Sequence, residues 1–278
     1  MQKICLITGC SSGFGFLFVK YLSKKHRVIA TVRNPQSILD LKNTFSPSEL
    51  KNIDIQLLDV TKTTSIKPCL SYIKKQYGKI DVLVNNAGYG LGGFFEDLTE
   101  HEIRNQLETN FFGLQSVTRE ALPLLRKIKG SKIINISSIA GLVGSPGLSA
   151  YNASKWAVEG FSESLYFEVL PFDIYVVLIE PGPFKTKILT ENVHLASNIK
   201  NPQSPYFMQS QKLLNKLNLV VDKLLDDPKK VAQLVDRIVE ERQPSFRYVI
   251  GKTAKLRYWL KRFLPFSLYS YFVKKAYN

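Results

Sequence analysis

The sequence has few side chains that bind metals or form cross-links. Its cysteines are Cys5, Cys10 and Cys69, and its histidines are His26, His101 and His194. The cysteines lack the paired spacing of zinc sites and are too few for a disulfide framework, which favours a reduced compartment. The histidines lie in dissimilar sequence contexts, so we interpret them as ordinary surface or cap residues. The sequence therefore predicts no metal site.

Long apolar runs are also absent. The longest uncharged stretch near the C-terminus, residues 263–273, is too short to span a bilayer and contains Pro265, Ser267 and Ser270. The chain begins with a short apolar run over residues 4–8 that lacks the architecture of a signal peptide. We therefore expect a soluble, cytoplasmic protein.

Acidic residues are scarce relative to basic ones. Lysine and arginine number 38 against 23 aspartates and glutamates, which gives a net charge of +15. Such an excess is typical of proteins that bind nucleic acid, an anionic membrane surface or acidic small ligands. The cations are spread along the chain without a recognised nucleic-acid-binding motif, so we predict no nucleic-acid partner.

Short β-branched runs alternate with longer stretches of helical periodicity. The runs are Ile4–Thr8, Val28–Val32, Ile53–Leu58, Ile80–Val84, Lys132–Ser137, Ile174–Glu180 and Tyr248–Ile250. Strands that are apolar on both faces and alternate with helices indicate a parallel sheet covered on both sides. We predict an α/β fold of the Rossmann type, a doubly wound parallel sheet of about seven strands in a single domain over residues 1–278.

Three apolar stripes mark helices. They are Ile66, Leu70, Ile73 and Tyr77; Ile103, Leu107, Phe111, Leu114 and Val117; and Val231, Leu234, Val235, Ile238 and Val239. Thr99 with Glu102 predicts a capping box before the second stripe, and Asp227 followed by Pro228 predicts an N-cap before the third. Residues 187–224 are polar and carry no strand signal, so we interpret them as a mobile element over the ligand site or, alternatively, a surface excursion.

A glycine-rich turn, Thr8–Gly15, follows the first predicted strand and opens the first helix. Glycines there allow a tight turn and let the backbone approach a pyrophosphate, which the helix N-terminus favours. The second strand ends at Arg33 and Asn34, without the acid that would bond a ribose 2′-hydroxyl. Arg33 with Ser11 and Ser12 suits a 2′-phosphate, so we predict NADP(H) over NAD(H), unless Arg33 is merely a solvated strand-end residue.

Tyr151 and Lys155 place a phenol and an ammonium one helical turn apart on the same face. A nearby cation favours the phenolate, so we expect Lys155 to lower the pKa of Tyr151 from about 10 towards neutral. Such a tyrosine can give a proton to a carbonyl oxygen or take one from an alcohol. An isolated pair of this kind more often only covers a helix surface, so a catalytic interpretation needs further motifs.

Further motifs do accompany this pair, in order along about the first 190 residues. They are TGxxxGxG at Thr8–Gly15, Asn85-Asn86-Ala87-Gly88, the serine element at Asn135–Gly141, YxxxK at Tyr151–Lys155, and Pro181-Gly182-Pro183 with Thr186. Together they resemble the short-chain dehydrogenase/reductase family. Phe14 departs from the family pattern, in which Ile or Leu usually separates the last two glycines, and should alter packing near the diphosphate.

The resemblance implies a role for each matching residue. Tyr151 would be the general acid/base, Lys155 would hold the nicotinamide ribose, and Ser138, favoured over Ser137 by spacing, would position the substrate oxygen. Asn110 matches a helix asparagine that supports a water chain to the lysine. The implied cofactor-binding residues are Gly9, Ser11, Ser12, Gly13, Phe14, Gly15, Arg33, Asp59, Val60, Asn86, Ala87, Gly88, Tyr151, Lys155, Pro181, Gly182 and Thr186.

The later third resembles the branch of this family that contains 17β-hydroxysteroid and retinol dehydrogenases. It carries Asp227–Ala232 and Arg247–Gly251 followed by a basic aromatic tail. This implies a lipophilic alcohol, ketone or aldehyde as substrate, with a sugar or acyl-carrier substrate as the alternative. Family members commonly pair through the helices that contain Asn110 and Tyr151, so a homodimer or homotetramer is expected. A non-catalytic NADP(H) sensor or scaffold is the rival function, although it would be expected to lose Ser138, Tyr151 or Lys155.

The C-terminal tail, residues 255–278, holds six lysines or arginines, no acid and many aromatic residues. Two interpretations stay open. The aromatic residues pack on the domain or a partner subunit while the cations are solvated, or both kinds contact the headgroup region of an anionic membrane. Pro265 interrupts the helical stripe and favours the first.

Overall fold

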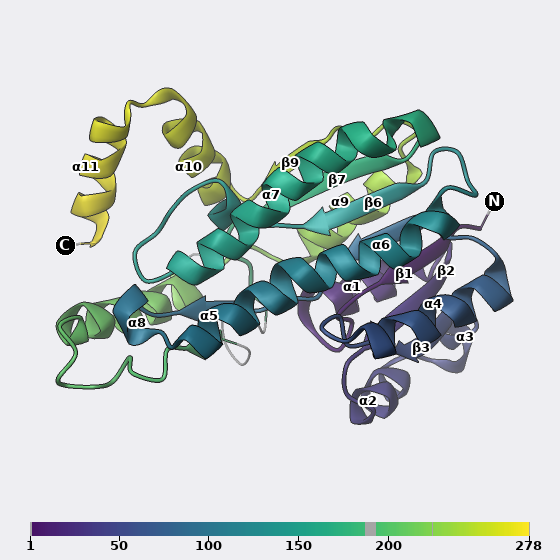
Figure 1. The fold of residues 1–278 in the computed structure, drawn as a ribbon, viewed down its shortest axis with the longest axis horizontal. Coiled ribbons are helices and arrows are strands. Elements are labelled where there is room, and N and C mark those ends of the chain that lie inside the picture. The colour runs from purple at the N-terminus through teal and green to yellow at the C-terminus, as the bar shows by residue number, and fades with distance from the viewer. Residues whose placement is uncertain (1, 187–192, 224, 278) are drawn as a thin grey trace.

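A seven-stranded parallel sheet forms the centre of the structure, in the order β3-β2-β1-β4-β6-β7-β9 (Figure 1). The computed structural model describes residues 2–186, 193–223 and 225–277. The strands are β1 (Ile4–Ile7), β2 (Arg27–Val32), β3 (Ile53–Leu57), β4 (Val82–Asn85), β6 (Lys132–Ile136), β7 (Tyr175–Pro181) and β9 (Arg247–Ile250). Each contains or overlaps one of the seven predicted runs, so the fold class is confirmed. Every residue of β1, β4 and β6 is buried, as their apolar character on both faces requires.

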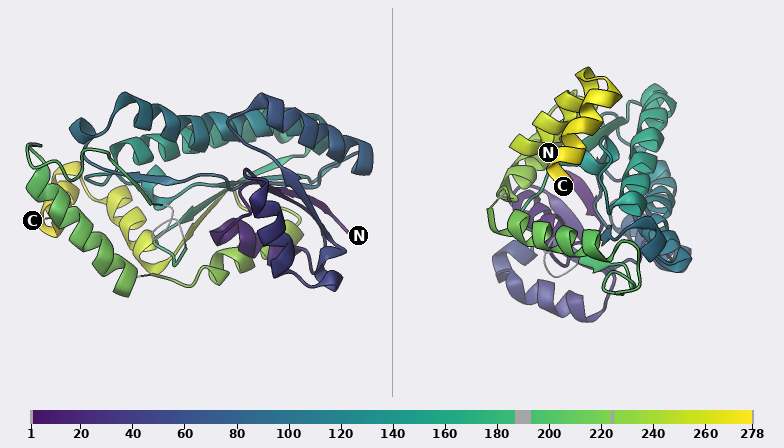
Figure 2. Two further views of the ribbon diagram at one scale, coloured as in Figure 1. Left: turned by 90° about the horizontal axis from the view of Figure 1, so that it is seen from below. Right: turned by 90° about the vertical axis from the view of Figure 1, so that its left-hand side faces the viewer.

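Helices cover both faces of the sheet (Figure 2). The first face carries α4 (Thr63–Tyr77), α5 (Glu100–Leu107), α6 (Gly113–Leu125) and α7 (Ser149–Val169), and the second carries α1 (Gly13–Leu22) and α9 (Lys229–Glu240). The short helices α2 (Gln36–Thr44) and α3 (Pro47–Leu50) join β2 to β3. Ile66, Leu70 and Ile73 are buried on α4, as their spacing predicts.

The second predicted stripe is helical but not one regular helix. Between α5 and α6 the chain makes a π-helical turn, η2 (Glu108–Phe112), which widens the helix by one residue. The capping box of Thr99 and Glu102 is present at the start of α5. At α9 the predicted N-cap is displaced by one residue, because Pro228 takes the cap position while the Asp227 carboxylate accepts the Lys229 N–H at 2.9 Å.

The described part of residues 187–224, residues 193–223, contains a strand and a helix. Within them, β8 (Val193–Leu195) pairs with β5 (Gly90–Gly92), and α8 (Phe207–Lys223) follows. The expectation of no strand was therefore wrong, because three residues are too few to show a periodicity. The Glu102 carboxylate accepts the Ser197 N–H at 2.9 Å, which attaches this region to α5. Residues 187–192 and 224 lie outside the described residues.

The C-terminal tail folds as two helices, α10 (Lys252–Phe263) and α11 (Phe266–Tyr277). Pro265 separates them, as predicted. Both helices lie at the end of the molecule towards which the strands point (Figure 1). In the part of the chain that the structure describes, no helix has the length and apolar character needed to cross a membrane.

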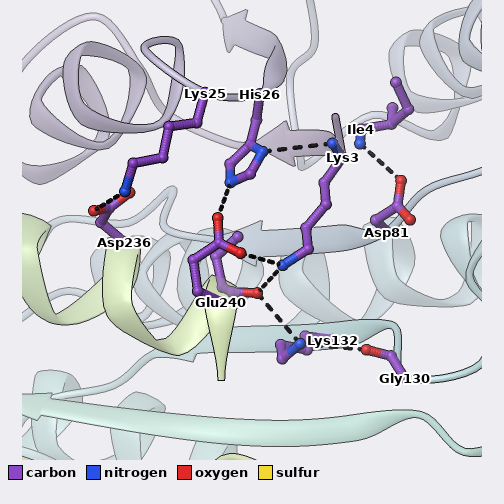
Figure 3. Close-up of polar contacts among 10 residues, drawn as sticks. Lys3, Ile4, Lys25, His26, Asp81, Gly130, Lys132, Asp236 and Glu240 are labelled. Carbon is purple, nitrogen blue, oxygen red and sulfur yellow. Dashed lines mark hydrogen bonds and ion pairs between the residues drawn. The ribbon is translucent and has the colours of Figure 1, made fainter. Parts of the chain in front are cut away.

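A charged cluster lies at the opposite end of the strands, next to the first residues of β1 and β2 (Figure 3). His26 is buried and its Nε2 lies 2.8 Å from a Glu240 carboxylate oxygen. Lys3 donates to the other Glu240 oxygen at 2.9 Å and to the Val239 carbonyl, so the cluster holds the C-terminal end of α9. His26 is therefore not an ordinary surface residue, contrary to the sequence interpretation.

Candidate active site

A cleft of about 610 Å³ lies where the sheet order reverses, between β1 and β4. Ligands of doubly wound sheets bind at this place because the loops after β1 and β4 diverge to opposite faces. Twelve predicted cofactor-binding residues line the cleft: Gly9, Ser11, Ser12, Gly13, Phe14, Arg33, Asp59, Val60, Asn86, Ala87, Gly88 and Thr186. They follow five different strands, β1, β2, β3, β4 and β7, and only the sheet brings them together.

The glycine turn after β1 needs glycine for two reasons. Gly9 has φ 71°, in the left-handed region, and a Cβ there would lie 2.9 Å from the Ala87 Cα. A Cβ on Gly15 would lie 2.2 Å from the Gly9 carbonyl oxygen, so this residue supports the turn from beneath instead of lining the cleft. Helix α1 begins at Gly13 with no acid in its first turn, and its N-terminus is suited to an anion.

Asn86 clamps the turn from the neighbouring strand. Its Nδ2 donates to the carbonyls of Thr8 and Gly9 at 2.9 and 3.0 Å. In return, the Thr8 hydroxyl accepts the backbone N–H groups of Asn86 and Ala87 at 2.9 and 3.0 Å. These bonds fix the distance between the carboxyl ends of β1 and β4, which is the width of the cleft at this point.

Arg33, Asp59 and Val60 line the cleft after β2 and β3. Arg33 is exposed directly after β2, with no carboxylate in the adjoining residues. The Asp59 carboxylate accepts the N–H and the hydroxyl of Thr61 at 3.0 and 2.8 Å, which shapes the turn after β3. Phe14 packs edge-on against Phe184, with ring centroids 5.7 Å apart, so its larger ring is accommodated beside the glycine turn.

The predicted catalytic side chains meet beyond the inner end of the cleft. The Ser138 hydroxyl lies beside the Tyr151 phenol, where it acts to lower the pKa of that phenol, and it accepts the Ala140 N–H at 3.1 Å. Ser137 is turned away, towards Glu159. Lys155 is buried one turn along α7, and its Nζ donates to the Ile136 carbonyl at 2.9 Å. None of these three side chains lines the cleft itself.

The pKa values of this pair differ from the sequence expectation. Burial of the phenol raises the pKa of Tyr151, and the neighbouring Ser138 hydroxyl only partly opposes it. The expected lowering by Lys155 is not found, because the Lys155 ammonium is 6.0 Å from the Tyr151 ring centroid and is bonded to a carbonyl instead. Burial lowers the pKa of Lys155 to about 8, and Glu159 opposes that shift.

Asn110 lies in the π-helical turn, beside both Gly88 and the catalytic helix. Its Nδ2 donates to the Tyr89 carbonyl at 3.0 Å and to the Ser154 hydroxyl at 3.1 Å. A Cβ on Gly88 would lie 3.0 Å from the Asn110 Oδ1 and 3.9 Å from the Lys155 Nζ. Gly88 thus lies between the cleft and the catalytic side chains, and the space around it is too small for a side chain.

A buried charge cluster behind Lys155 was missed by the sequence reasoning. Arg247 on β9 donates to Glu159 at 2.8 Å and to Glu180. Burial, followed by the charge of Glu159, raises the pKa of Glu180, and burial also raises that of Glu159. The available signals were an acid four residues after Lys155 and another at the end of an otherwise apolar strand.

Other residues of the cleft also carried no recognised signal. Tyr89, Leu91, Glu102, Asn105, Glu108, Thr109, His194 and Leu195 are among its lining residues. His194 is exposed, as the sequence interpretation expected, and its ring also contacts the Tyr89 ring at the cleft, with centroids 4.6 Å apart. Pro181 and Gly182 do not line the cleft, and a Cβ on Gly182 would lie 3.0 Å from the Ala254 Cβ.

Fold and site together define an oxidoreductase that uses a nicotinamide dinucleotide. The glycine turn, the helix N-terminus and the hydroxyl-lined cleft fit the pyrophosphate of such a cofactor. The family model for short chain dehydrogenases matches residues 3–195, and the chain belongs to this family. Solved structures of the same fold include one with 5-hydroxy-NADP, one with NADP and one with NAD.

Individual relatives resemble the chain over nearly its whole length. The uncharacterised oxidoreductase YusZ of Bacillus subtilis is 41% identical, over 99% of this chain and 98% of its own. A 3-ketodihydrosphingosine reductase of Bacteroides thetaiotaomicron is 38% identical over 93% of each chain. A short-chain dehydrogenase from Streptomyces avermitilis, solved by crystallography, has a TM-score of 0.81 and 32% identity over 93% of this chain and 92% of its own.

Proposed function

We propose that the protein is an NADP(H)-dependent oxidoreductase that interconverts a lipophilic alcohol and its ketone or aldehyde. The observation that carries this proposal is that the side chains of Ser138 and Tyr151 lie side by side, one helical turn from the buried Lys155. Two neighbouring hydroxyls can bind one substrate oxygen between them. A non-catalytic sensor would have no need to keep all three side chains.

When bound, the nicotinamide gives hydride to the carbonyl carbon or takes it from the alcohol. In reduction, Tyr151 donates its phenolic proton to the carbonyl oxygen; in oxidation it accepts the alcohol proton. Ser138 donates a hydrogen bond to the same oxygen and orients it. Lys155, whose pKa burial lowers to about 8, would hold the nicotinamide ribose hydroxyls when the cofactor is bound. Asn110 keeps Tyr89 and the catalytic helix at a constant distance.

The cofactor preference rests on the surroundings of Arg33. Its guanidinium lines the cleft together with the hydroxyls of Ser11 and Ser12, and no acid follows β2. A 2′-phosphate would receive charge-assisted hydrogen bonds there, whereas a 2′-hydroxyl would find no carboxylate to accept its proton. We assign NADP(H) over NAD(H) on this basis.

The lipophilic substrate is supported by apolar side chains near the inner end of the cleft. Leu91 and Leu195 come from the paired strands β5 and β8, and Tyr89 lies beside them. The Bacteroides relative is named as a reductase of a long-chain ketone, 3-ketodihydrosphingosine, which is a substrate of this kind. Both points favour a hydrophobic carbonyl compound over a sugar.

The decisive experiment follows NADPH absorbance with a panel of lipophilic ketones, aldehydes and alcohols. Tyr151→Phe should keep NADPH binding and lose turnover by about 10²- to 10⁴-fold, the usual contribution of a general acid. Tyr175→Phe, a change to a half-buried tyrosine on β7, is the matched control and should keep full activity. Full activity in Tyr151→Phe, or NADPH binding without turnover of any compound, would refute the assignment.

We also infer that two copies pair through α7 and the adjoining helical segment. Trp156 and Phe167 are exposed on one face of α7, and Phe112 is exposed on the neighbouring η2. Large aromatic side chains on adjacent outer faces are typical of a self-complementary interface. Trp156→Glu should lower the molar mass measured by light scattering, and an unchanged mass would contradict the pairing.

The proposed compartment is the cytoplasm. Cys5, Cys10 and Cys69 are free and buried, and burial raises the pKa of Cys10 and Cys69 to about 12. Buried thiols with so little thiolate character fit a reducing compartment. Among the described residues, no cluster of three potential metal ligands is found. Neither a metal nor a nucleic acid enters the proposed reaction.

A further inference from the structure

The helices α10 and α11 present large apolar side chains to the exterior. Leu256, Trp259 and Phe263 lie at positions i, i+3 and i+7 of α10, which places them on one helix face. Trp259 and Phe263 are 50% and 72% exposed, and their rings stack with centroids 5.4 Å apart. Phe266 of α11 is 71% exposed. We call this surface the hairpin outer face, defined by Leu256, Trp259, Phe263, Phe266, Leu268, Tyr271 and Phe272.

A different set of side chains attaches the hairpin to the domain. Ala254 and Tyr269 are buried in a cluster with Ile139 and Val143, which follow Ser138 in the sequence. Arg257 donates to the Ser145 hydroxyl at 2.7 Å. The hairpin therefore has a fixed inner face, and the aromatic residues of the outer face are not needed to hold it in place.

The charged residues of the two helices are all basic. Lys255, Arg262, Lys274 and Lys275 are exposed on the two helices, and the sequence contains no acid after Glu241. A second copy of the chain would bring these cations against identical cations in a symmetric pairing, which is unfavourable. The matching surface must carry negative charge and accept aromatic rings.

We propose that the hairpin outer face docks on the surface of an anionic lipid bilayer. Aromatic rings favour the headgroup level of a bilayer, and each lysine or arginine near an anionic leaflet gains about 1 kcal/mol. Both helices have 12 residues and are about 18 Å long, well short of the hydrocarbon core of about 30 Å. The contact is therefore peripheral, with the helices lying on the surface.

Docking would also set the orientation of the active site. The inner face of the hairpin packs on the segment directly after Ser138. This segment lies beyond the carboxyl ends of the strands, where the cleft also lies. A lipophilic substrate could then pass from the bilayer to the site over a short path. This consequence rests on the proposed substrate class, whereas the docking itself does not.

The test is sedimentation of the full chain with vesicles of phosphatidylcholine alone or mixed with phosphatidylglycerol. The chain should bind the mixed vesicles, bind more weakly at high salt, and remain in solution with phosphatidylcholine alone. Lys274→Gln with Lys275→Gln should weaken binding about 30-fold, since each lost charge is worth about fivefold. Trp259→Ala with Phe263→Ala should weaken it by about tenfold or more, and in a Trp156→Phe background the Trp259 emission should shift to shorter wavelength on binding.

The residues for matched control variants lie at the opposite end of the strands from the hairpin. Leu170 and Phe172 are each 47% exposed before β7, and Lys127 and Lys129 are exposed after α6. Changing the first pair to Ala, or the second pair to Gln, should leave vesicle binding unchanged. Equal binding by hairpin and control variants, or no preference for phosphatidylglycerol, would overturn the proposal. So would a fall in molar mass of the hairpin variants without vesicles, because that would identify a protein interface.

A water-soluble substrate separates this proposal from the proposed function. The hairpin variants should reduce such a substrate at the rate of the unmodified protein, because no residue of the outer face belongs to the catalytic site. Vesicle binding without any turnover would count against the proposed function alone. Turnover without vesicle binding would count against the docking alone.

Discussion

The side-chain amide of Asn110 and the backbone of Tyr89 form two reciprocal hydrogen bonds, each 3.0 Å long. Asn110 is 1% exposed and lies in a π-helical turn, a distortion that often marks a functional site. The pair ties the loop after β4 to the helix beside the catalytic side chains. It therefore couples the geometry of the cleft to that of α7.

Replacing Asn110 by Ala should lower both stability and activity. The change leaves the buried Tyr89 N–H without an acceptor, which costs about 1–3 kcal/mol, and it frees Tyr89 beside the cleft. Urea unfolding and kcat/KM measure the two effects. Asn105→Ala, one turn earlier and exposed, should change stability little. Equal stability of the Asn110 variant and the unmodified protein would contradict this account.

Arg33→Ala should weaken NADPH binding by about tenfold to a hundredfold and leave NADH binding nearly unchanged. The expected loss corresponds to about 1.5–3 kcal/mol for hydrogen bonds to a charged group, and only the 2′-phosphate makes them. Fluorescence titration with each cofactor measures both affinities. Lys42→Ala on α2 serves as a control for the change in net charge. An equal loss for the two cofactors would remove the argument for NADP(H).

Arg247→Met should destabilise the protein by roughly 3–5 kcal/mol, because the buried Glu159 and Glu180 lose the guanidinium that both contact. Arg242→Met, a change to an exposed arginine nearby, is the control and should cost much less. Urea unfolding of the two variants at neutral pH provides the comparison. Similar midpoints would show that the cluster contributes little to stability.

The raised pKa of Glu180 predicts that the free energy of unfolding falls as the pH rises through neutral. The folded state keeps a proton that the unfolded chain releases above the ordinary value of about 4.5, so this group's contribution declines as pH rises through neutral. Glu180→Gln resembles the protonated form and should lose less stability than the unmodified protein between pH 6 and about 9. Unfolding midpoints across this range test the prediction, and parallel curves for the two proteins would contradict it.

The lowered pKa of His26 predicts the opposite dependence at acid pH. Burial, opposed by Glu240, disfavours the imidazolium in the folded state, so stability is lost as pH falls below the ordinary value of about 6.5. The lowered pKa of Glu240 adds a further loss at more acid pH. His26→Gln should be less stable at pH 7 and less sensitive to acidification, whereas exposed His101→Gln should match the unmodified protein. Thermal unfolding at several pH values distinguishes these outcomes.

The sequence predicted the central part of this protein well. The seven strands of the main sheet were found because each contains a run rich in β-branched residues, a pattern that depends on neighbouring residues alone. The glycine turn was found for a similar reason, since Gly9 and Gly15 serve a close backbone approach that few other residues allow. The Tyr151 and Lys155 spacing gave their common helix face but not the environment that sets their pKa values.

The features that the sequence did not predict depend on contacts between segments that are far apart in the chain. The pairing of β5 with β8, the burial of His26 and the assembly of Arg247 with Glu159 and Glu180 each join residues far apart in the chain. The same holds for the tail, where Tyr269 packs on the domain while Trp259 and Phe263 face outward, and membrane contact stays a prediction.

Local patterns therefore determined which segments become strands and helices and where a dinucleotide would bind. Only the tertiary structure decided which polar groups are buried and which apolar groups stay exposed to solvent. Burial is a property of what covers a residue, and the covering segments are brought to it by the whole fold.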